Sequence, residues 1–102
     1  MKLDYEEFAT TYNASKKKKI LLDVRNPDEL RSGSFAAAKN IPIPQLSGRY
    51  HELDDQAEIY IFCKMGGRAE RAYDFLQDIG IVNLYASTSG GFSDLEGLID
   101  EG

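Results

Sequence analysis

The stretch Tyr60–Leu76, YIFCKMGGRAERAYDFL, places the only cysteine of the chain between an apolar run and a segment of helical periodicity. The residues Glu58–Phe62, EIYIF, are typical of a central strand that is buried on both faces of a parallel sheet. After the glycines, apolar residues recur at spacings of three and four, which predicts an amphipathic helix ending at Gly80. A buried strand, a glycine turn and a helix indicate an α/β unit.

Strand and helix patterns continue upstream of this stretch. Ile20–Val24, ILLDV, predicts a second buried strand. The residues that follow have the sequence of a helix start, with Asn26 as the N-cap and Pro27 at the first helical position. Glu29 stands three residues after Asn26, where its carboxylate can reach back to the Asn26 amide in a capping box. Gly33 is a suitable stop for this helix.

Shorter signals mark the remaining elements. The N-terminal residues MKLDYEEFATTY predict an amphipathic helix that packs through four apolar side chains, namely Leu3, Tyr5, Phe8 and Tyr12. Lys39–Pro44 contains two prolines, which cannot donate to a sheet ladder, so we expect a brief edge or connecting strand there. Val82–Tyr85 is a third strand candidate. Ser93 and Glu96 have capping-box spacing and predict the start of a last helix.

Length and composition indicate a single domain over residues 1–102. A chain of 102 residues, with 42% hydrophobic and 28% charged residues, is suited to one compact unit with one modest core. The alternation of strands and helices predicts an α/β domain with a central, mainly parallel sheet of about five strands and helices on both faces.

The charge and the cysteine content exclude several classes of protein. The chain carries 17 acidic and 12 basic residues and a net charge of -5, which argues against binding to nucleic acid or to an anionic membrane. No apolar run has the length of a membrane span, and the N-terminus lacks the apolar segment of a signal peptide. A single cysteine cannot form an internal disulfide, so we expect a reducing compartment, the cytoplasm.

Metal and cofactor binding is not expected from the sequence. His51 is the only histidine, and a lone cysteine with one distant histidine does not give the ligand spacing of a metal site. We therefore expect His51 to be a surface residue and the protein to work without a metal or cofactor.

Cys63 stands where the chain leaves a buried strand. In open α/β sheets, ligands bind beyond the carboxyl ends of the strands. Glycines in the turn Lys64–Arg68 allow backbone amides to converge on one point, and these amides and the helix N-terminus favour negative charge. The same field stabilises a thiolate, which makes Cys63 a candidate nucleophile that needs no histidine base. On its own, a cysteine after an apolar strand is usually a small buried hydrophobe.

Four motifs together resemble the rhodanese family of sulfurtransferases, in its single-domain form. They are Asp23-Val24-Arg25, Asn40-Ile41-Pro42, the cysteine loop and the Gly-Gly-Phe of residues 90–92, and they stand in the order of that family. The resemblance implies a three-layer fold. It also implies that Cys63 accepts a sulfane sulfur from a donor such as thiosulfate, becomes a persulfide, and passes the sulfur to a thiophilic acceptor such as cyanide or a protein thiol.

The resemblance also assigns residues to roles. It makes Cys63 the nucleophile and gives the binding of the donor and of the persulfide to the loop residues Lys64, Met65, Gly66, Gly67 and Arg68. Asp23 and Arg25 are expected to form a structural pair that braces this loop, rather than to react. The implied partners are small sulfur-containing anions and the thiols of donor or acceptor proteins.

The chain departs from the family pattern at three places. Where the family commonly has Gly-His-Ile-Pro-Gly-Ala, residues 33–39 have the sequence GSFAAAK. One extra residue precedes Gly90, and Leu95 replaces the usual tryptophan. We expect these changes to affect the rim of the pocket, where the preference for a donor is set.

Two other functions remain open. Phosphatases and arsenate reductases related to rhodanese have a loop that is one residue longer, which accommodates a tetrahedral oxyanion. Only four residues separate Cys63 from Arg68, and Arg71 is expected to lie too far away, so sulfur transfer is preferred. A regulatory interaction module often lacks the cysteine, whereas a sulfur carrier that loads Cys63 for a partner enzyme is compatible with the sequence.

Overall fold

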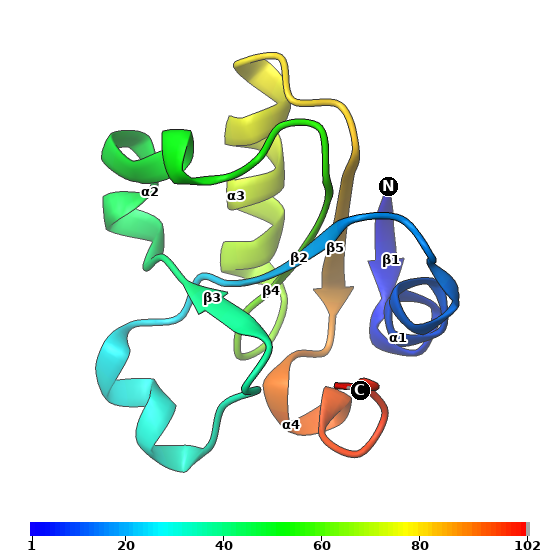
Figure 1. The fold of residues 1–102 in the computed structure, drawn as a ribbon. Helices are drawn as coiled ribbons and strands as arrows, with labels where there is room; N and C mark the ends of the chain where they lie inside the picture. Colours follow the sequence, from blue (N-terminus) through cyan, green and yellow to red (C-terminus); the bar gives the residue numbers. More distant parts are fainter. Residues whose placement is uncertain (102) are drawn as a thin grey trace.

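The computed structural model describes residues 1–101, which fold into three layers around one parallel sheet (Figure 1). The sheet has the strand order β1-β5-β4-β2-β3, and all four strand pairs are parallel. The strands are β1 (Lys2–Asp4), β2 (Lys19–Asp23), β3 (Ala38–Asn40), β4 (Glu58–Phe62) and β5 (Leu84–Ser89). This arrangement confirms the predicted α/β class and the five-stranded parallel sheet.

Helices cover both faces of the sheet. The α-helices are α1 (Tyr5–Ala14), α2 (Ile43–Arg49), α3 (Gly67–Asp78) and α4 (Phe92–Leu95), and the short 3-10 helices are η1 (Pro27–Ser32) and η2 (Tyr50–Glu52). Figure 1 shows α2 and α3 on one side of the sheet and α1 and α4 on the other. No helix within residues 1–101 has the length and apolar character needed to cross a bilayer.

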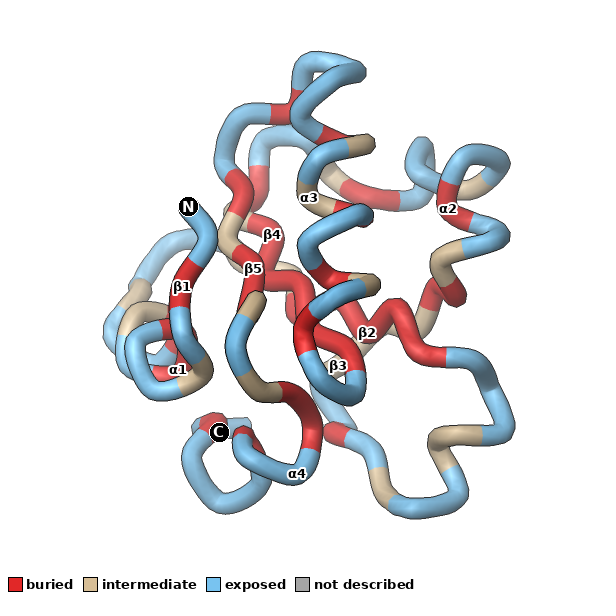
Figure 2. The backbone as a smooth tube through the Cα atoms, turned by 180° about the vertical axis from the view of Figure 1, so that it is seen from behind, coloured by how far each residue is buried: buried red, intermediate tan, exposed pale blue. Residues whose placement is uncertain are grey.

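The pleat of the central strand β4 sorts its side chains between two apolar clusters. Ile59 and Ile61 pack into the cluster that contains the buried face of α3, whereas Tyr60 and Phe62 pack into the cluster with α1 and α4. All four side chains are fully buried. Figure 2 shows this burial along the centre of the sheet. Since side chains alternate along a strand, the next residue, Cys63, falls on the α3 side.

The register of β2 and β4 brings the two predicted functional motifs to one edge of the sheet. Asp23, at the end of β2, lies opposite Phe62, at the end of β4. The pairing continues beyond the strands, because the Val24 N–H donates to the Phe62 carbonyl at 3.1 Å. Asp23 and Cys63 therefore stand at neighbouring carboxyl ends, as expected for a ligand site in a parallel sheet.

The N-terminal segment differs from the single helix that the sequence predicts. Residues Lys2–Asp4 form the edge strand β1, which places Leu3 in the sheet. The helix α1 begins only at Tyr5, where Asp4 caps it by accepting the N–H of Glu7 at 2.9 Å. A three-residue strand is too short to show its own periodicity, and its pairing with β5 determines its conformation. The predicted burial of Phe8 and Tyr12 on the helix is confirmed.

The segment after β2 starts and stops as predicted but is a 3-10 helix, η1. The Glu29 carboxylate accepts the Asn26 N–H at 3.0 Å, which is the expected half of a capping box. Gly33 ends η1 with a φ of 129°, and its N–H donates to the Leu30 carbonyl at 3.1 Å. The tighter winding is common in helices of this short length.

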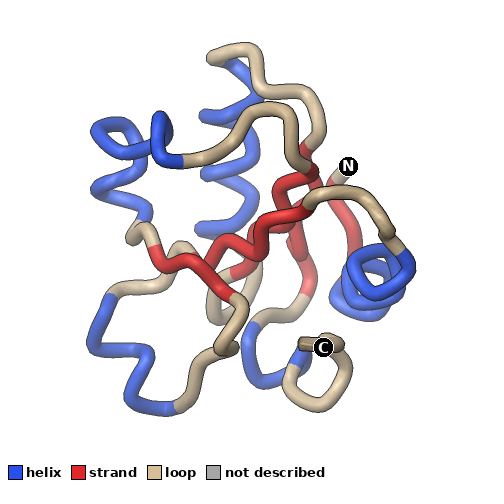
Figure 3. The backbone as a smooth tube through the Cα atoms, in the orientation of Figure 1, coloured by secondary structure: helices blue, strands red, loops and turns tan. Residues whose placement is uncertain are grey.

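Two predictions near the C-terminus need correction, and Figure 3 shows the elements concerned. Strand β5 spans Leu84–Ser89, so it begins later and runs further than the predicted Val82–Tyr85. The capping box of Ser93 and Glu96 is wrong, because α4 begins at Phe92 and Asp94 caps it by accepting the Gly91 N–H at 3.0 Å. The brief edge strand is confirmed as β3, but it ends at Asn40 rather than continuing to Pro44, because α2 begins at Ile43.

Candidate active site

The sulfur of Cys63 is held by backbone amides. Its Sγ accepts the Gly66 N–H at 3.1 Å and the Ala69 N–H at 3.3 Å. The residue follows β4 directly and is only 1% exposed. The N–H groups of Gly67 and Arg68 make no hydrogen bond to another residue of the described chain. Of the predicted loop amides, only that of Gly66 therefore reaches the sulfur, and the second donor, Ala69, lies beyond the predicted loop in α3.

Gly66 allows the loop to close around the sulfur. It has a φ of 118°, which L side chains rarely adopt, and it is the N-cap of α3. A Cβ at this position would lie 2.3 Å from the carbonyl oxygen of Thr88 on β5. Any larger residue would have to displace either the loop or the strand.

The Gly-Gly-Phe segment packs against the backbone of the cysteine loop. A Cβ at Gly91 would come within 2.1 Å of the Lys64 carbonyl oxygen and 2.3 Å of that of Cys63, so the two backbones touch. The Phe92 N–H donates to the Cys63 carbonyl at 2.9 Å, and the Gly90 N–H donates to that of Met65 at 3.3 Å. The segment between β5 and α4 therefore fixes the backbone of the cysteine loop.

A pocket of about 250 Å³ opens above Cys63. Its lining comes from the loop and the start of α3, namely Cys63, Lys64, Met65, Gly67, Arg68 and Arg71. Four of the five predicted loop residues thus line this Cys63 pocket, and the fifth, Gly66, binds the sulfur. Met65 lies at its rim and is 76% exposed. Arg71 was expected to lie too far away, but one helical turn brings it from Gly67 back to the same pocket.

The cation of Arg68 is paired with Glu29 of η1. Arg68 Nη1 lies 2.5 Å from Glu29 Oε1, and Nη2 lies 2.9 Å from Oε2, so the contact is bidentate. The hydrogen bonds from Arg68 lower the pKa of Glu29 from its ordinary 4.5 to about 2. The same contact raises the pKa of Arg68. Sequence reasoning missed this pair, because the two residues are 39 positions apart.

Asp23 and Arg25 form a second bidentate pair, which is fully buried. Arg25 Nε donates to Asp23 Oδ1 at 3.0 Å, and Nη2 donates to Oδ2 at 2.8 Å. Nη2 also donates to the Gly33 carbonyl at 3.0 Å, at the end of η1. The guanidinium lies 4.3 Å from the ring centroid of Phe92. The pair joins β2, η1 and α4, and neither residue lines the Cys63 pocket.

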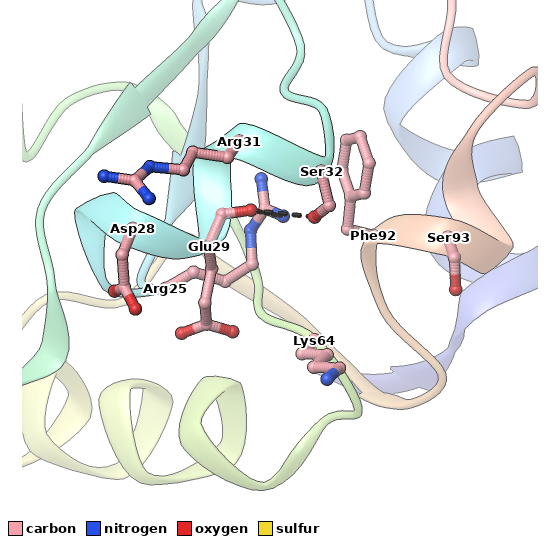
Figure 4. A pocket seen from close by; sticks show the side chains of 8 residues that line it. All are labelled: Arg25, Asp28, Glu29, Arg31, Ser32, Lys64, Phe92 and Ser93. Carbon is pink, nitrogen blue, oxygen red and sulfur yellow. Dashed lines mark hydrogen bonds between the residues drawn. The ribbon is translucent and has the colours of Figure 1, made fainter.

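A second pocket of about 380 Å³ lies between η1, the cysteine loop and α4. Figure 4 shows its lining, in which the Arg25 side chain lies near the Phe92 ring and the Glu29 carboxylate points toward α3. Lys64 lines both this pocket and the Cys63 pocket, so the two are neighbours. Of the residues that the structure describes, Lys64 is the one lining residue that the two pockets share.

His51 does not belong to this site. His51 is exposed on η2, as predicted, and it lines a separate surface pocket with Tyr50 and Leu53. Within residues 1–101, no group of three or more His, Cys, Asp or Glu side chains is arranged to hold a metal ion.

A parallel three-layer sandwich that presents one cysteine in an amide-lined loop defines an α/β protein with a candidate functional site at the carboxyl edge of its sheet. The model of the rhodanese-like domain family matches residues 6–97, which is most of the chain. The chain therefore belongs to the rhodanese-like family, as its motifs predict.

Two curated relatives and a solved structure are similar to this chain over more than two thirds of their own lengths. The uncharacterised protein YqhL of Bacillus subtilis is 35% identical over 97 residues, covering 95% of this chain and 73% of its own. A Schizosaccharomyces pombe protein named "Putative thiosulfate sulfurtransferase, mitochondrial" is 26% identical over 96 residues, covering 76% of this chain and 68% of its own. The crystal structure of a rhodanese-related protein from Thermoplasma volcanium has a TM-score of 0.78 and 28% identity, covering 97% and 94% of the two chains.

Proposed function

We propose that this protein is a sulfurtransferase that carries a sulfane sulfur on Cys63. It takes the sulfur from thiosulfate or another persulfide donor and passes it to a thiophilic acceptor, either cyanide or a thiol. The observation that carries this proposal is the Cys63 Sγ, which accepts two backbone N–H groups at the base of an open pocket. Membership of the rhodanese-like family and the name of the S. pombe relative support it.

In the first half-reaction, the Cys63 thiolate attacks the outer, sulfane sulfur of thiosulfate. A new bond forms between the two sulfurs, and the sulfur–sulfur bond of thiosulfate breaks. Sulfite leaves with the electron pair of that bond, and Cys63 becomes a persulfide anion. No proton transfer is needed for this step, which is consistent with a site whose pocket lining contains no histidine.

In the second half-reaction, the acceptor attacks the outer sulfur of the persulfide. With cyanide, the products are thiocyanate and the regenerated Cys63 thiolate. With a thiolate acceptor, the outer sulfur moves to the acceptor, which becomes a persulfide itself. The charge on the enzyme stays at one negative sulfur throughout, so preorganised donors can stabilise every state without rearrangement.

The loop residues have distinct roles in this proposal. The amides of Gly66 and Ala69 hold the inner sulfur of Cys63. The amides of Gly67 and Arg68, which make no hydrogen bond within residues 1–101, bind the outer sulfur or the donor in this proposal. Lys64, Met65 and Arg68 line the entrance to the sulfur. Asp23 and Arg25 position η1 and α4 around the loop, and they take no part in the chemistry.

The alternatives predict different chemistry at the same cysteine. A sulfur carrier would take up one sulfur and release it only to a partner protein. An oxyanion phosphatase or arsenate reductase would hold a tetrahedral ion, for which the six residues from Cys63 to Arg68 make a short loop. A free thiol that cycles through a persulfide requires a reducing compartment, so we propose that the protein acts in the cytoplasm.

Thiocyanate formation from thiosulfate and cyanide tests the proposal. We expect steady turnover by the native protein and none by Cys63→Ser, because a hydroxyl cannot carry the sulfane sulfur. The serine oxygen can still accept the Gly66 and Ala69 amides, so the variant should keep its circular dichroism spectrum and its unfolding midpoint. Turnover in the serine variant, or hydrolysis of a phosphate ester without sulfur uptake, would contradict the proposal.

A further inference from the structure

We propose that Arg71, and not the loop residue Arg68, supplies the positive charge that selects a dianionic sulfur donor. This inference rests on the proposed sulfurtransferase function, and it names the donor class as one with a sulfonate group, such as thiosulfate. Three cations line the Cys63 pocket, namely Lys64, Arg68 and Arg71. Lys64, like Arg71, has no ion pair within residues 1–101, so ion pairing distinguishes only between the two arginines, Arg68 and Arg71.

Arg68 already forms an ion pair with a carboxylate. Both of its terminal nitrogens contact Glu29, at 2.5 and 2.9 Å, and the two side chains are only 24% and 21% exposed. To bind Arg68, a donor sulfonate would have to displace the Glu29 carboxylate from the two terminal nitrogens of the guanidinium. The net charge that the pair presents to the pocket is close to zero.

Arg71 has no such partner within residues 1–101, although acidic residues flank it on α3. Glu70 and Asp74 both pair with Lys2 of β1, whose Nζ lies 3.1 and 3.0 Å from their carboxylates. Lys2 thus engages the two acids that could otherwise neutralise Arg71. The guanidinium of Arg71 remains exposed and charged at the edge of the pocket.

The position of the Arg71 side chain fits a sulfonate above the sulfur of Cys63. Its Nη1 would be 3.9 Å from a Cβ at Gly67, so the guanidinium lies beside the first residue of α3. Gly67 and Arg68 line the same pocket as Arg71, and their N–H groups make no hydrogen bond within residues 1–101. A sulfonate in this pocket would accept hydrogen bonds from these two amides and from the planar guanidinium of Arg71, which suits a group with three oxygens.

Arg71 should act in the first half-reaction only. Thiosulfate brings two negative charges to the pocket, and sulfite departs with both of them when the sulfur–sulfur bond breaks. The persulfide that remains carries a single charge, held by the loop amides. Removing Arg71 should therefore impair loading by thiosulfate more than release to the acceptor.

Two donors that have the same reactive sulfur but different charges test this role of Arg71. Methanethiosulfonate carries one charge instead of two, and its sulfane sulfur transfers in the same way while methanesulfinate leaves. For Arg71→Ala, we expect kcat/KM to fall about 10-fold with thiosulfate and about threefold with methanethiosulfonate, since a charge-assisted hydrogen bond contributes roughly this much. We expect kcat/KM for cyanide to change less than about twofold, and Arg71→Lys to recover part of the loss.

Arg31→Ala is the matched control. Arg31 is also an exposed arginine, but it lines the neighbouring pocket rather than the Cys63 pocket. This variant loses the same charge and should change kcat/KM for thiosulfate less than about twofold. Equal losses with both donors, an equal loss in Arg31→Ala, or full activity in Arg71→Ala would overturn the inference while leaving the sulfurtransferase function in place. Failure of the native protein to take sulfur from either donor would instead overturn the proposed function.

Discussion

Two arginine–carboxylate pairs lie at the carboxyl edge of the sheet, and they differ mainly in burial. Asp23 and Arg25 are 1% and 2% exposed, whereas Glu29 and Arg68 are 21% and 24% exposed. Both contacts are bidentate. The buried pair connects the backbone of η1 to the ring of Phe92, whereas in the partly exposed pair Arg68 lines the Cys63 pocket and Glu29 lines the neighbouring one.

The difference shows that similar contacts can serve structure in one place and electrostatics in another. A buried charge without its partner is costly, so the Asp23–Arg25 pair must persist as long as the fold does. The Glu29–Arg68 pair remains near water, where its contribution to stability is smaller but where its net charge acts on a bound anion. The comparison predicts separate consequences for variants of the two pairs.

The largest effect is expected for the buried pair. Arg25→Met should lower the free energy of unfolding by about 3–5 kcal/mol, because it leaves the Asp23 carboxylate buried without its cation. Urea unfolding at neutral pH, followed by circular dichroism, would measure this loss. The double variant Asp23→Asn, Arg25→Met should lose less than the sum of the two single variants, since it leaves no unpaired charge. A loss below about 1 kcal/mol for Arg25→Met would show that the buried pair matters no more for stability than the partly exposed pair.

The second prediction concerns how Glu29 makes the free energy of unfolding depend on pH. Its pKa is lowered in the folded protein to about 2 by Arg68, so its carboxylate stabilises the fold above its ordinary pKa of 4.5. That contribution, about 1 kcal/mol for a partly exposed pair, is lost as the pH falls from about 4.5 to about 2. The difference in unfolding free energy between the native protein and Glu29→Gln should therefore be constant near neutrality and shrink in acid.

A surface carboxylate provides the control for this measurement. Glu52 pairs with Arg49 and Lys39, and its pKa is also lowered to about 2, first by the hydrogen bond from Arg49. Because this pair is more exposed to solvent, added salt should reduce the effect of Glu52→Gln more than that of Glu29→Gln. The same salt sensitivity in both variants would show that the Glu29–Arg68 pair is an ordinary surface contact.

The smallest effect is expected on activity. Glu29→Gln removes the negative charge that compensates Arg68, so kcat/KM for thiosulfate should rise about two- to threefold. The conservative change Asp23→Asn should give no such rise, because neither Asp23 nor Arg25 lines the Cys63 pocket. Unchanged or reduced activity in Glu29→Gln would show that the compensation of Arg68 by Glu29 does not limit donor binding.

The sequence was sufficient to predict the parts of the fold that depend on local patterns. The apolar run of β4 and the glycines after Cys63 indicate a strand end and an amide-lined turn, and the structure has both. Strand β1 could not be predicted in the same way. Its three residues carry no periodic signal, and only pairing with β5 makes them a strand.

The electrostatics of the site were predicted less well, because they depend on contacts between distant segments. Arg68 was predicted to lie in the loop, whereas it belongs to the first turn of α3, and its partner Glu29 comes from η1, which the adjacency of β2 and β4 brings near. Arg71 was dismissed on sequence spacing, although the helical repeat returns it to the pocket. A basic residue one helical turn beyond such a loop is the sequence signal that would have indicated a role for Arg71.

The most direct test of the central claim is the intact mass of the protein after incubation with thiosulfate. The account predicts a gain of one sulfur atom per chain, located on Cys63 by peptide mapping and removed by cyanide with the formation of one thiocyanate. Cys63→Ser should gain nothing under the same conditions. An unchanged mass in the native protein, or a sulfur found on any residue other than Cys63, would contradict the account.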